Sequence, residues 1–166
     1  MLKIAYKGTM MSDGRFCSNG EWICDLDKIP LGELLKANID IVCGKGNQLK
    51  LIFDKPIDRR DFSNVIPVVA EYEMMKTPIV LDIPKTGKYR LYQNLENALL
   101  AFVNEGYEKI FSDVDIARVA TEGQNKLICF YNADDEFVYG IMPMDAKETL
   151  TVFADLIMRR YGQKHD

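Results

Sequence analysis

The stretch Leu127–Tyr161, which reads LICFYNADDEFVYGIMPMDAKETLTVFADLIMRRY, decides the fold that we expect. It contains an apolar run, a polar turn, a second apolar run and then a helix-like pattern that begins after Pro143. Leu127–Tyr131 is apolar at every position, which is typical of a strand that is covered on both faces. The stretch therefore predicts a strand, a turn, a second strand over Phe137–Met142 and a helix over Asp145–Tyr161.

A weaker copy of this plan lies in the first half of the chain. Pro56–Asp61 (PIDRRD) and Pro143–Glu148 (PMDAKE) share the pattern Pro, apolar, Asp, any residue, basic, acidic. In both, the Asp is expected to cap a helix while the acid three residues later reaches back to it. The first of these helices is expected over Asp58–Lys76, interrupted or delayed by Pro67. This shared register predicts an internal duplication, with halves at residues 1–76 and 88–161.

The remaining elements complete the predicted fold. They are a strand over Leu2–Tyr6, a hairpin over Arg15–Cys24, a short helix over Leu31–Ala37, a hairpin over Ile39–Phe53, strands over Pro78–Ile83 and Lys88–Tyr92, and a helix over Asn94–Glu105. Residues 107–124 are expected to hold a short strand and one helical turn. The pattern predicts an α+β fold, with a mostly antiparallel sheet of about seven to nine strands and three longer helices. We expect two pseudo-symmetric halves, each containing a β-hairpin followed by a helix, in a single domain over residues 1–166.

Composition and charge narrow the classes of function. The chain is 48% hydrophobic and 28% charged, which is typical of a globular protein. Its net charge of −4 argues against binding to a nucleic-acid backbone or to an anionic membrane. No apolar run reaches the length of a membrane span, and the N-terminus does not resemble a signal peptide. We expect a cytoplasmic protein that binds neither nucleic acid nor membrane.

The inventory of reactive side chains is short. The four cysteines have no C-x-x-C spacing, and a two-residue turn at Asn19-Gly20 would place Cys17 and Cys24 diagonally, too far apart for a relaxed disulfide. We therefore expect free thiols in a reducing compartment. The only histidine is His165, next to the C-terminal residue. This argues against Ser-His-Asp and Cys-His arrangements and against His-based metal sites, and we expect no catalytic residue, no metal site and no cofactor.

The densest acidic cluster is Asp134, Asp135 and Glu136, in the turn between the two strands of the decisive stretch. Such a turn can be a solvated loop, a partial cation site or an acidic surface for a basic partner. The corresponding turn of the first half contains Lys45 and Asn47 and no acid. Because a carboxylate cluster is present in only one of the two turns, the comparison of the turns favours contact with a partner over metal binding. We take these five residues as the candidate partner-binding site.

Two classes of function remain open. The first is a non-catalytic protein-binding or inhibitory protein of the small bacterial type, which acts by surface contact with a protein partner. A second copy of the chain, in a homodimer, is one candidate for that partner. The second is an enzyme or small-ligand binder that uses a carboxylate-lined cleft between the two halves. The absence of a catalytic motif from the sequence favours the first class.

Overall fold

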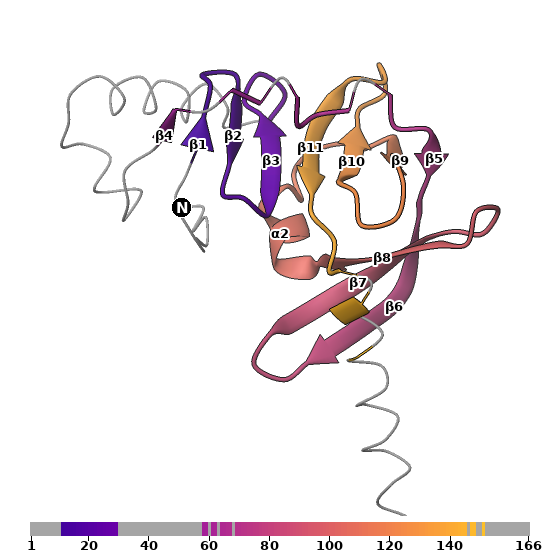
Figure 1. Ribbon diagram of the computed structural model, residues 1–166. Helices are drawn as coiled ribbons and strands as arrows, with labels where there is room; N and C mark the ends of the chain where they lie inside the picture. Colours follow the sequence, from indigo (N-terminus) through magenta and orange to yellow (C-terminus); the bar gives the residue numbers. More distant parts are fainter. Residues whose placement is uncertain are drawn as a thin grey trace, which may run out of the picture.

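The computed structural model describes residues 11–29 and 69–145, together with 58, 59, 61, 62, 64–67, 147, 148 and 151. Within these residues the chain forms two β-sheets, with one short helix, α2, between them (Figure 1). Also within the described residues, no helix is long and apolar enough to cross a membrane. The first half of the chain is described only in part, so the expected elements over Leu2–Tyr6, Leu31–Ala37 and Ile39–Phe53 lie outside the described residues.

The larger sheet joins distant parts of the chain. In the described part it has eight strands in the order β4-β1-β2-β3-β11-β10-β9-β5. Neighbouring strands are antiparallel, except that β1 and β4 are parallel. At its centre β3 pairs with β11, where Trp22 lies opposite Ile141. The strands are β1 (Met11–Ser12), β2 (Phe16–Ser18), β3 (Trp22–Asp25), β4 (Asp58–Arg59), β5 (Tyr72–Glu73), β9 (Arg118–Thr121), β10 (Ile128–Tyr131) and β11 (Phe137–Ile141).

The smaller sheet consists of three consecutive antiparallel strands in the described residues, β6 (Met75–Ile83), β7 (Gly87–Asn94) and β8 (Leu99–Asn104). The helix α2 (Glu105–Ile110) begins directly after β8. It starts there because the side chain of Asn104 accepts a hydrogen bond from the backbone N–H of Gly106, at 2.8 Å. Two acids in its first turn complement the positive end of the helix dipole.

The two sheets share one hydrophobic core. Trp22, Phe130 and Ile141 of the larger sheet are buried with Tyr92 and Val103 of the smaller one. The ring of Tyr92 meets that of Phe130 edge to face, with centroids 5.8 Å apart. Edge-to-face packing of this kind contributes beyond the burial of area alone, so the smaller sheet is held against the larger one by specific contacts.

The expected α+β class, with a hairpin followed by a helix in each half, is wrong. The described residues form mostly antiparallel sheet, with eleven strands, the short helix α2 and a few helical residues after Asp145. Where the first half was expected to have a helix over Asp58–Lys76, the described residues form β4, a turn and β5, and β6 begins at Met75. Val65 and Val69 of the expected helix face are 51% and 64% exposed, so the apolar spacing does not mark one buried face.

The expected helix over Asn94–Glu105 is also wrong. Asn94 does accept a local hydrogen bond, from the N–H of Asn97 at 2.9 Å, but this bond closes a turn. The chain then returns as β8, in register with β7, so that Leu91 lies opposite Phe102. In the middle of β8 both faces are covered, so Ala101, Phe102 and Val103 are buried side by side, and this produced the misleading helical spacing. Gly106, the residue directly after this expected helix, lies in the first turn of α2.

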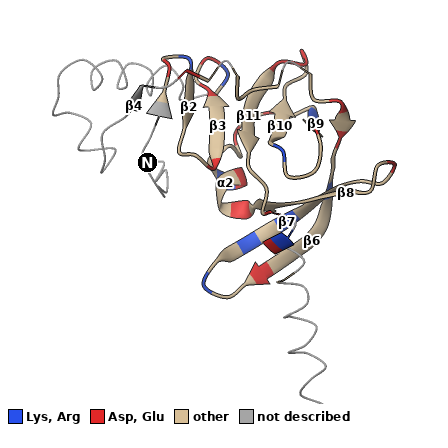
Figure 2. Cartoon of the chain, in the orientation of Figure 1, with Lys and Arg blue, Asp and Glu red and all other residues tan. Residues whose placement is uncertain are grey.

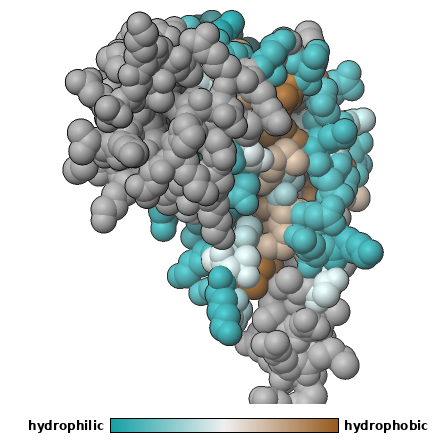
Figure 3. Space-filling view, turned by 60° about the vertical axis from the view of Figure 1, so that its left-hand side comes forward, coloured by the Kyte–Doolittle hydropathy of each residue, from teal (hydrophilic) through white to brown (hydrophobic). Residues whose placement is uncertain are grey.

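The first part of the decisive stretch, strand-turn-strand, is confirmed as the hairpin of β10 and β11. All four residues of β10 are buried, as expected for a strand covered on both faces. Pro78–Ile83 is almost as apolar in sequence but is not covered on both faces, since Ile79 and Val80 on β6 are exposed. On the face shown in Figure 3, a band of hydrophobic residues reaches the surface beside hydrophilic ones.

The start of the last helix is described in part. Residues 147, 148 and 151 are helical, and the carboxylate of Asp145 accepts a hydrogen bond from the backbone N–H of Lys147 at 2.8 Å. This confirms Asp145 as the capping residue. Its expected counterpart, Asp58, lies in strand β4 and is not a helix cap. Without a hairpin-helix unit around Asp58, the shared sequence pattern does not correspond to a shared structure.

Candidate functional site

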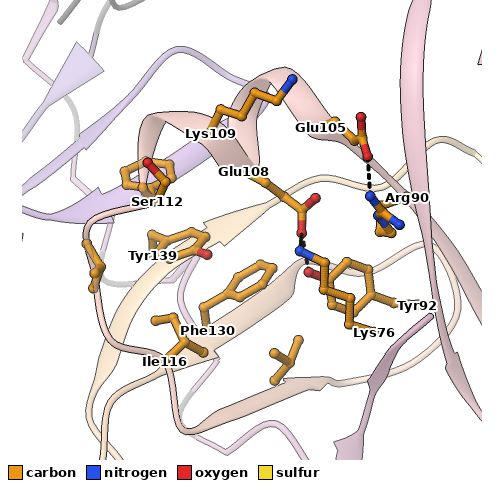
Figure 4. A pocket seen from close by; sticks show the side chains of 13 residues that line it. Lys76, Arg90, Tyr92, Glu105, Glu108, Lys109, Ser112, Ile116, Phe130 and Tyr139 are labelled. Atoms are coloured by element: carbon orange, nitrogen blue, oxygen red, sulfur yellow. Dashed lines mark hydrogen bonds and ion pairs between the residues drawn. The ribbon is translucent and has the colours of Figure 1, made fainter. Parts of the chain in front are cut away.

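A pocket of about 560 Å³ lies between the two sheets and beneath α2 (Figure 4). Its lining comes from β6 and β7 of the smaller sheet, from α2, from residues 111–116, and from β9, β10 and β11 of the larger sheet. Pockets of this size between packed elements are the usual sites for small organic ligands. The pocket is therefore the best candidate for a functional site in the described residues.

The floor of the pocket is aromatic. Phe130 and Tyr139 are direct cross-strand partners on β10 and β11, and their rings stack with centroids 4.2 Å apart and planes 13° apart. Phe111 stacks on the other face of Tyr139, also at 4.2 Å. Register thus explains the stack, because opposite residues on an antiparallel pair bring their side chains together. The hydroxyl of Tyr139 points toward the interior of the pocket (Figure 4).

The roof of the pocket carries two carboxylates. Glu105 and Glu108 are three residues apart on α2, so their side chains lie on the same side of the helix. Glu108 accepts a short hydrogen bond from the hydroxyl of Tyr92. It also forms an ion pair with the ammonium of Lys76, whose Nζ lies 3.1 Å from Oε1 of Glu108. The side chain of Glu108 is only 11% exposed, whereas that of Lys76 is 56% exposed. A mostly buried carboxylate therefore faces the pocket, and its ion-pair partner is exposed to solvent.

Glu105 has a more enclosed partner. The Nη2 of Arg90 lies 2.5 Å from its Oε1, and the side chains of both residues are mostly buried. The other terminal nitrogen of Arg90 donates to the carbonyl of Thr77 at 3.3 Å, which fixes the guanidinium. Arg90 and Tyr92 lie two residues apart on β7, so they share the face that meets the pocket. Figure 2 shows basic residues of the smaller sheet next to the acidic residues of α2.

The tyrosine hydroxyls of the pocket are hydrogen-bond donors at neutral pH. Burial raises the pKa of Tyr92 well above its usual range, and the hydrogen bond to Glu108 raises it further. Burial, with a smaller effect from the charge of Glu108, also raises the pKa of Tyr139. Both hydroxyls therefore stay protonated, which suits binding and does not suit a tyrosinate base.

The described residues contain no group of three or more Asp, Glu, His or Cys side chains that could hold a metal ion. The thiols of the described part are also poorly suited to nucleophilic chemistry. Burial raises the pKa of Cys17 and Cys129 to about 12, and burial raises that of Cys24 well above its ordinary value. The expected diagonal placement of Cys17 and Cys24 is wrong, since they are direct partners on β2 and β3; both are free thiols.

The acidic turn lies outside the pocket lining, and its charges are partly paired. Asp135 forms an ion pair with Arg118 at 2.7 Å, and Glu136 forms one with Lys28 at 2.5 Å. Asp134 is exposed at the tip of the turn. Lys45 and Asn47, the other two expected partner-binding residues, lie outside the described residues. Whether the five residues form a binding surface therefore stays a prediction.

Sequence reasoning missed the pocket residues. The Glu105-x-x-Glu108 spacing is a usable signal, but it is divided between the expected helix over Asn94–Glu105 and residues 107–124. Alternation along β7 also places Arg90 and Tyr92 on one face, which is unusual for a face turned toward a core. Neither signal reveals Lys76, whose approach to Glu108 depends on how β6 pairs with β7.

Comparison with known proteins gave no match: none was found among protein-family models, among curated proteins or among solved structures.

Proposed function

We propose that this protein is a non-catalytic binding protein that holds a small organic ligand in the pocket between its two sheets. The observation that carries the proposal is the combination of an aromatic floor with a mostly buried carboxylate, Glu108, in one pocket. An apolar surface with a few convergent polar groups is the usual composition of a ligand site. This proposal corresponds to the small-ligand alternative expected from the sequence. The carboxylate-lined pocket lies between the two sheets, however, and not between the two expected halves of the chain.

Binding is a better assignment than catalysis for this pocket. Glu105 and Glu108 are each engaged by a cation, and Tyr92 donates to Glu108. A general base needs a carboxylate that is free to take a proton from the substrate. The pairing of both carboxylates with Arg90 and Lys76 supports recognition of a ligand by charge and hydrogen bonding.

The proposal is tested by filling the pocket. Ile116 lines the pocket, and Ile116→Trp should block it by bulk without removing a charge. Ile79→Trp makes the same kind of change at an exposed position of β6 that is not part of the lining. A library of small aromatic compounds of all charge types is screened by ligand-observed NMR against the parent and both variants.

We expect compounds that bind the parent and Ile79→Trp and fail to bind Ile116→Trp. A library that gives no binder, or binders that are indifferent to Ile116→Trp, would show that the pocket is not a ligand site. Circular dichroism of both variants checks that each is folded.

A second proposal keeps the expected contact with a basic protein partner through the acidic turn. The exposure of Asp134 at the tip of that turn favours it. Asp134→Asn should slow capture of a basic partner most at low salt, because exposed charges act mainly on the association rate. Asp135→Asn is the matched comparison, since its carboxylate is already paired with Arg118. Equal capture by all three proteins at low salt would refute this proposal.

The expected homodimer is tested separately, by sedimentation of the protein alone.

A further inference from the structure

We infer that the ligand of the pocket is an organic amine, with a protonated amino group that binds Glu108 and an apolar body that lies over the aromatic floor. This inference rests on the proposed ligand-binding function and specifies the chemical class of the ligand. It follows from which of the charged groups in the pocket can be displaced at low cost.

The ion pair between Lys76 and Glu108 is asymmetric. The carboxylate of Glu108 is mostly buried, while the side chain of Lys76 is 56% exposed. Lys76 can move its ammonium into water at a low cost in free energy, because an ammonium on a flexible chain is readily hydrated. Glu108 cannot do so, and a buried carboxylate that loses its cation is strongly disfavoured. Whatever replaces Lys76 must therefore bring a positive charge.

Lys76 already shows the binding mode of an amine. Its ammonium lies beside the carboxylate of Glu108 and the hydroxyl of Tyr92, at the edge of the pocket (Figure 4). A free amine can take the same position and keep the same interactions. Lys76 thus acts as an internal competitor, which the ligand displaces.

The second ion pair works against anionic ligands. Arg90 and Glu105 are both mostly buried, and Arg90 is held in addition by the carbonyl of Thr77. An anionic ligand that takes the position of Glu105 or Glu108 would draw Arg90 or Lys76 away from its carboxylate. This would leave a mostly buried Glu105 or Glu108 without its cation. The ammonium of Lys109, the third cation of the lining, points away from Glu108 in Figure 4.

The rest of the pocket suits the apolar body of such a ligand. Val114, Ile116 and Val119 line it together with the stacked rings of Phe130 and Tyr139. Aromatic faces attract cations as well as burying apolar surface, so they favour an ammonium over a neutral group of the same shape. The pocket volume of about 560 Å³ leaves room for a body larger than a single ring.

Three matched probes test the charge preference. They share a phenyl ring and a two-carbon chain and differ in the end group: 2-phenylethylamine is cationic, 2-phenylethanol is neutral and 3-phenylpropionate is anionic. Dissociation constants are measured at pH 7 and low salt by NMR titration of the parent. We expect the amine to bind about tenfold more tightly than the alcohol, as fits one hydrogen bond to a charged group, and the anion to bind most weakly.

Two substitutions test the residues. Glu108→Gln keeps the shape and the acceptor but removes the charge, so the amine should bind about tenfold more weakly while the alcohol is unchanged. Lys76→Met removes the competing ammonium and should raise the affinity for the amine by about threefold, as fits the displacement of an exposed ion-pair partner. Lys109→Met is the control: it makes the same change of net charge one residue from Glu108 but leaves the competitor in place.

The outcomes separate the inference from the proposed function. If the alcohol or the anion binds as tightly as the amine, and this binding is lost in Ile116→Trp, the pocket is a ligand site but the amine assignment is wrong. If Lys76→Met weakens amine binding, or raises it no more than Lys109→Met does, Lys76 is not a competitor and the inference fails. If none of the probes and no library compound binds, the proposed function fails and the inference with it.

Discussion

At the scale of single residues, the ion pair between Lys28 and Glu136 makes the stability of the protein depend on pH. Glu136 accepts hydrogen bonds from Lys28 at 2.5 Å and from the amide of Asn132 at 3.0 Å. These two bonds, the one from Lys28 first, lower the pKa of Glu136 below its ordinary value of 4.5. A group with a lowered folded pKa stabilises the fold above its unfolded pKa, and this contribution is lost as the pH falls through the folded pKa.

Glu136→Gln should therefore lower the free energy of unfolding relative to the parent at pH 7, and the difference should disappear on acidification below the folded pKa of Glu136. Urea unfolding at a series of pH values between pH 7 and the acid limit of the fold measures this. Asp134→Asn makes the same charge change in the same turn and serves as the control. A difference between parent and Glu136→Gln that is constant over this pH range would contradict the assignment.

The residue scale is also where the sequence was least informative about the pocket. Asp134–Glu136 stand out as a cluster of like charges, whereas Glu108 is a single acid in an ordinary segment. What distinguishes Glu108 is its burial next to Tyr92, with the exposed Lys76 as its ion-pair partner, and these three residues come from three different elements. Tertiary packing brings these three residues into contact, so no local pattern in the sequence predicts the contact.

At the scale of elements, the close contact between β11 and the segment before β10 gives a sharp prediction. Gly140 lies on β11, and a Cβ atom at this position would lie 2.7 Å from Cδ2 and 2.8 Å from Cγ of Leu127. Gly140→Ala should therefore overpack this contact and destabilise the protein by about 1–3 kcal/mol. The free energy of unfolding from urea denaturation measures the cost.

A double-mutant cycle identifies the cause. In the presence of Leu127→Ala, the methyl group of Gly140→Ala has space, and its cost should fall to a small value. If Gly140→Ala is equally costly with and without Leu127, the contact with Leu127 is not the reason for the glycine.

The hairpin of β10 and β11 was predictable from the sequence, and the strand β8 was not. The hairpin of β10 and β11 is marked by two apolar runs around a polar turn, and its boundaries agree with the expectation to within one or two residues. In β8 the apolar residues Leu99, Phe102 and Val103 have helical spacing only because side chains on both faces pack against other elements. Periodicity cannot separate a short helix from a strand of this kind.

At the scale of the whole molecule, the shared core should make both sheets unfold together. Phe130 is buried at the point where the rings of Tyr139 and Tyr92 meet it from the two sheets. Phe130→Ala should cost about 3–5 kcal/mol. Fluorescence of Trp22 follows the larger sheet, and hydrogen exchange of the β7 amides follows the smaller one.

We expect one transition with coincident midpoints in the parent, and coincident loss of stability at both probes in Phe130→Ala, as a two-state single domain requires. Ile79→Ala, at an exposed site on β6, should change stability by no more than about 0.5 kcal/mol. If Phe130→Ala lowers protection in β7 while the Trp22 transition is unchanged, the sheets are independent units and the expectation of one domain is wrong.

The pairing of β3 with β11 has a consequence for how the protein is made. Trp22 and Ile141 are neighbours in the sheet, yet most of the described chain lies between them in sequence. A ribosome adds about 5–20 residues per second, so β3 waits on the order of ten seconds before β11 exists. During synthesis, β3 has its hairpin partner β2 on one side and an unpaired, apolar edge on the other. The centre of the larger sheet is therefore completed only after β11 has been synthesised, and until then the exposed edge of β3 in the nascent β2–β3 hairpin is open to aggregation.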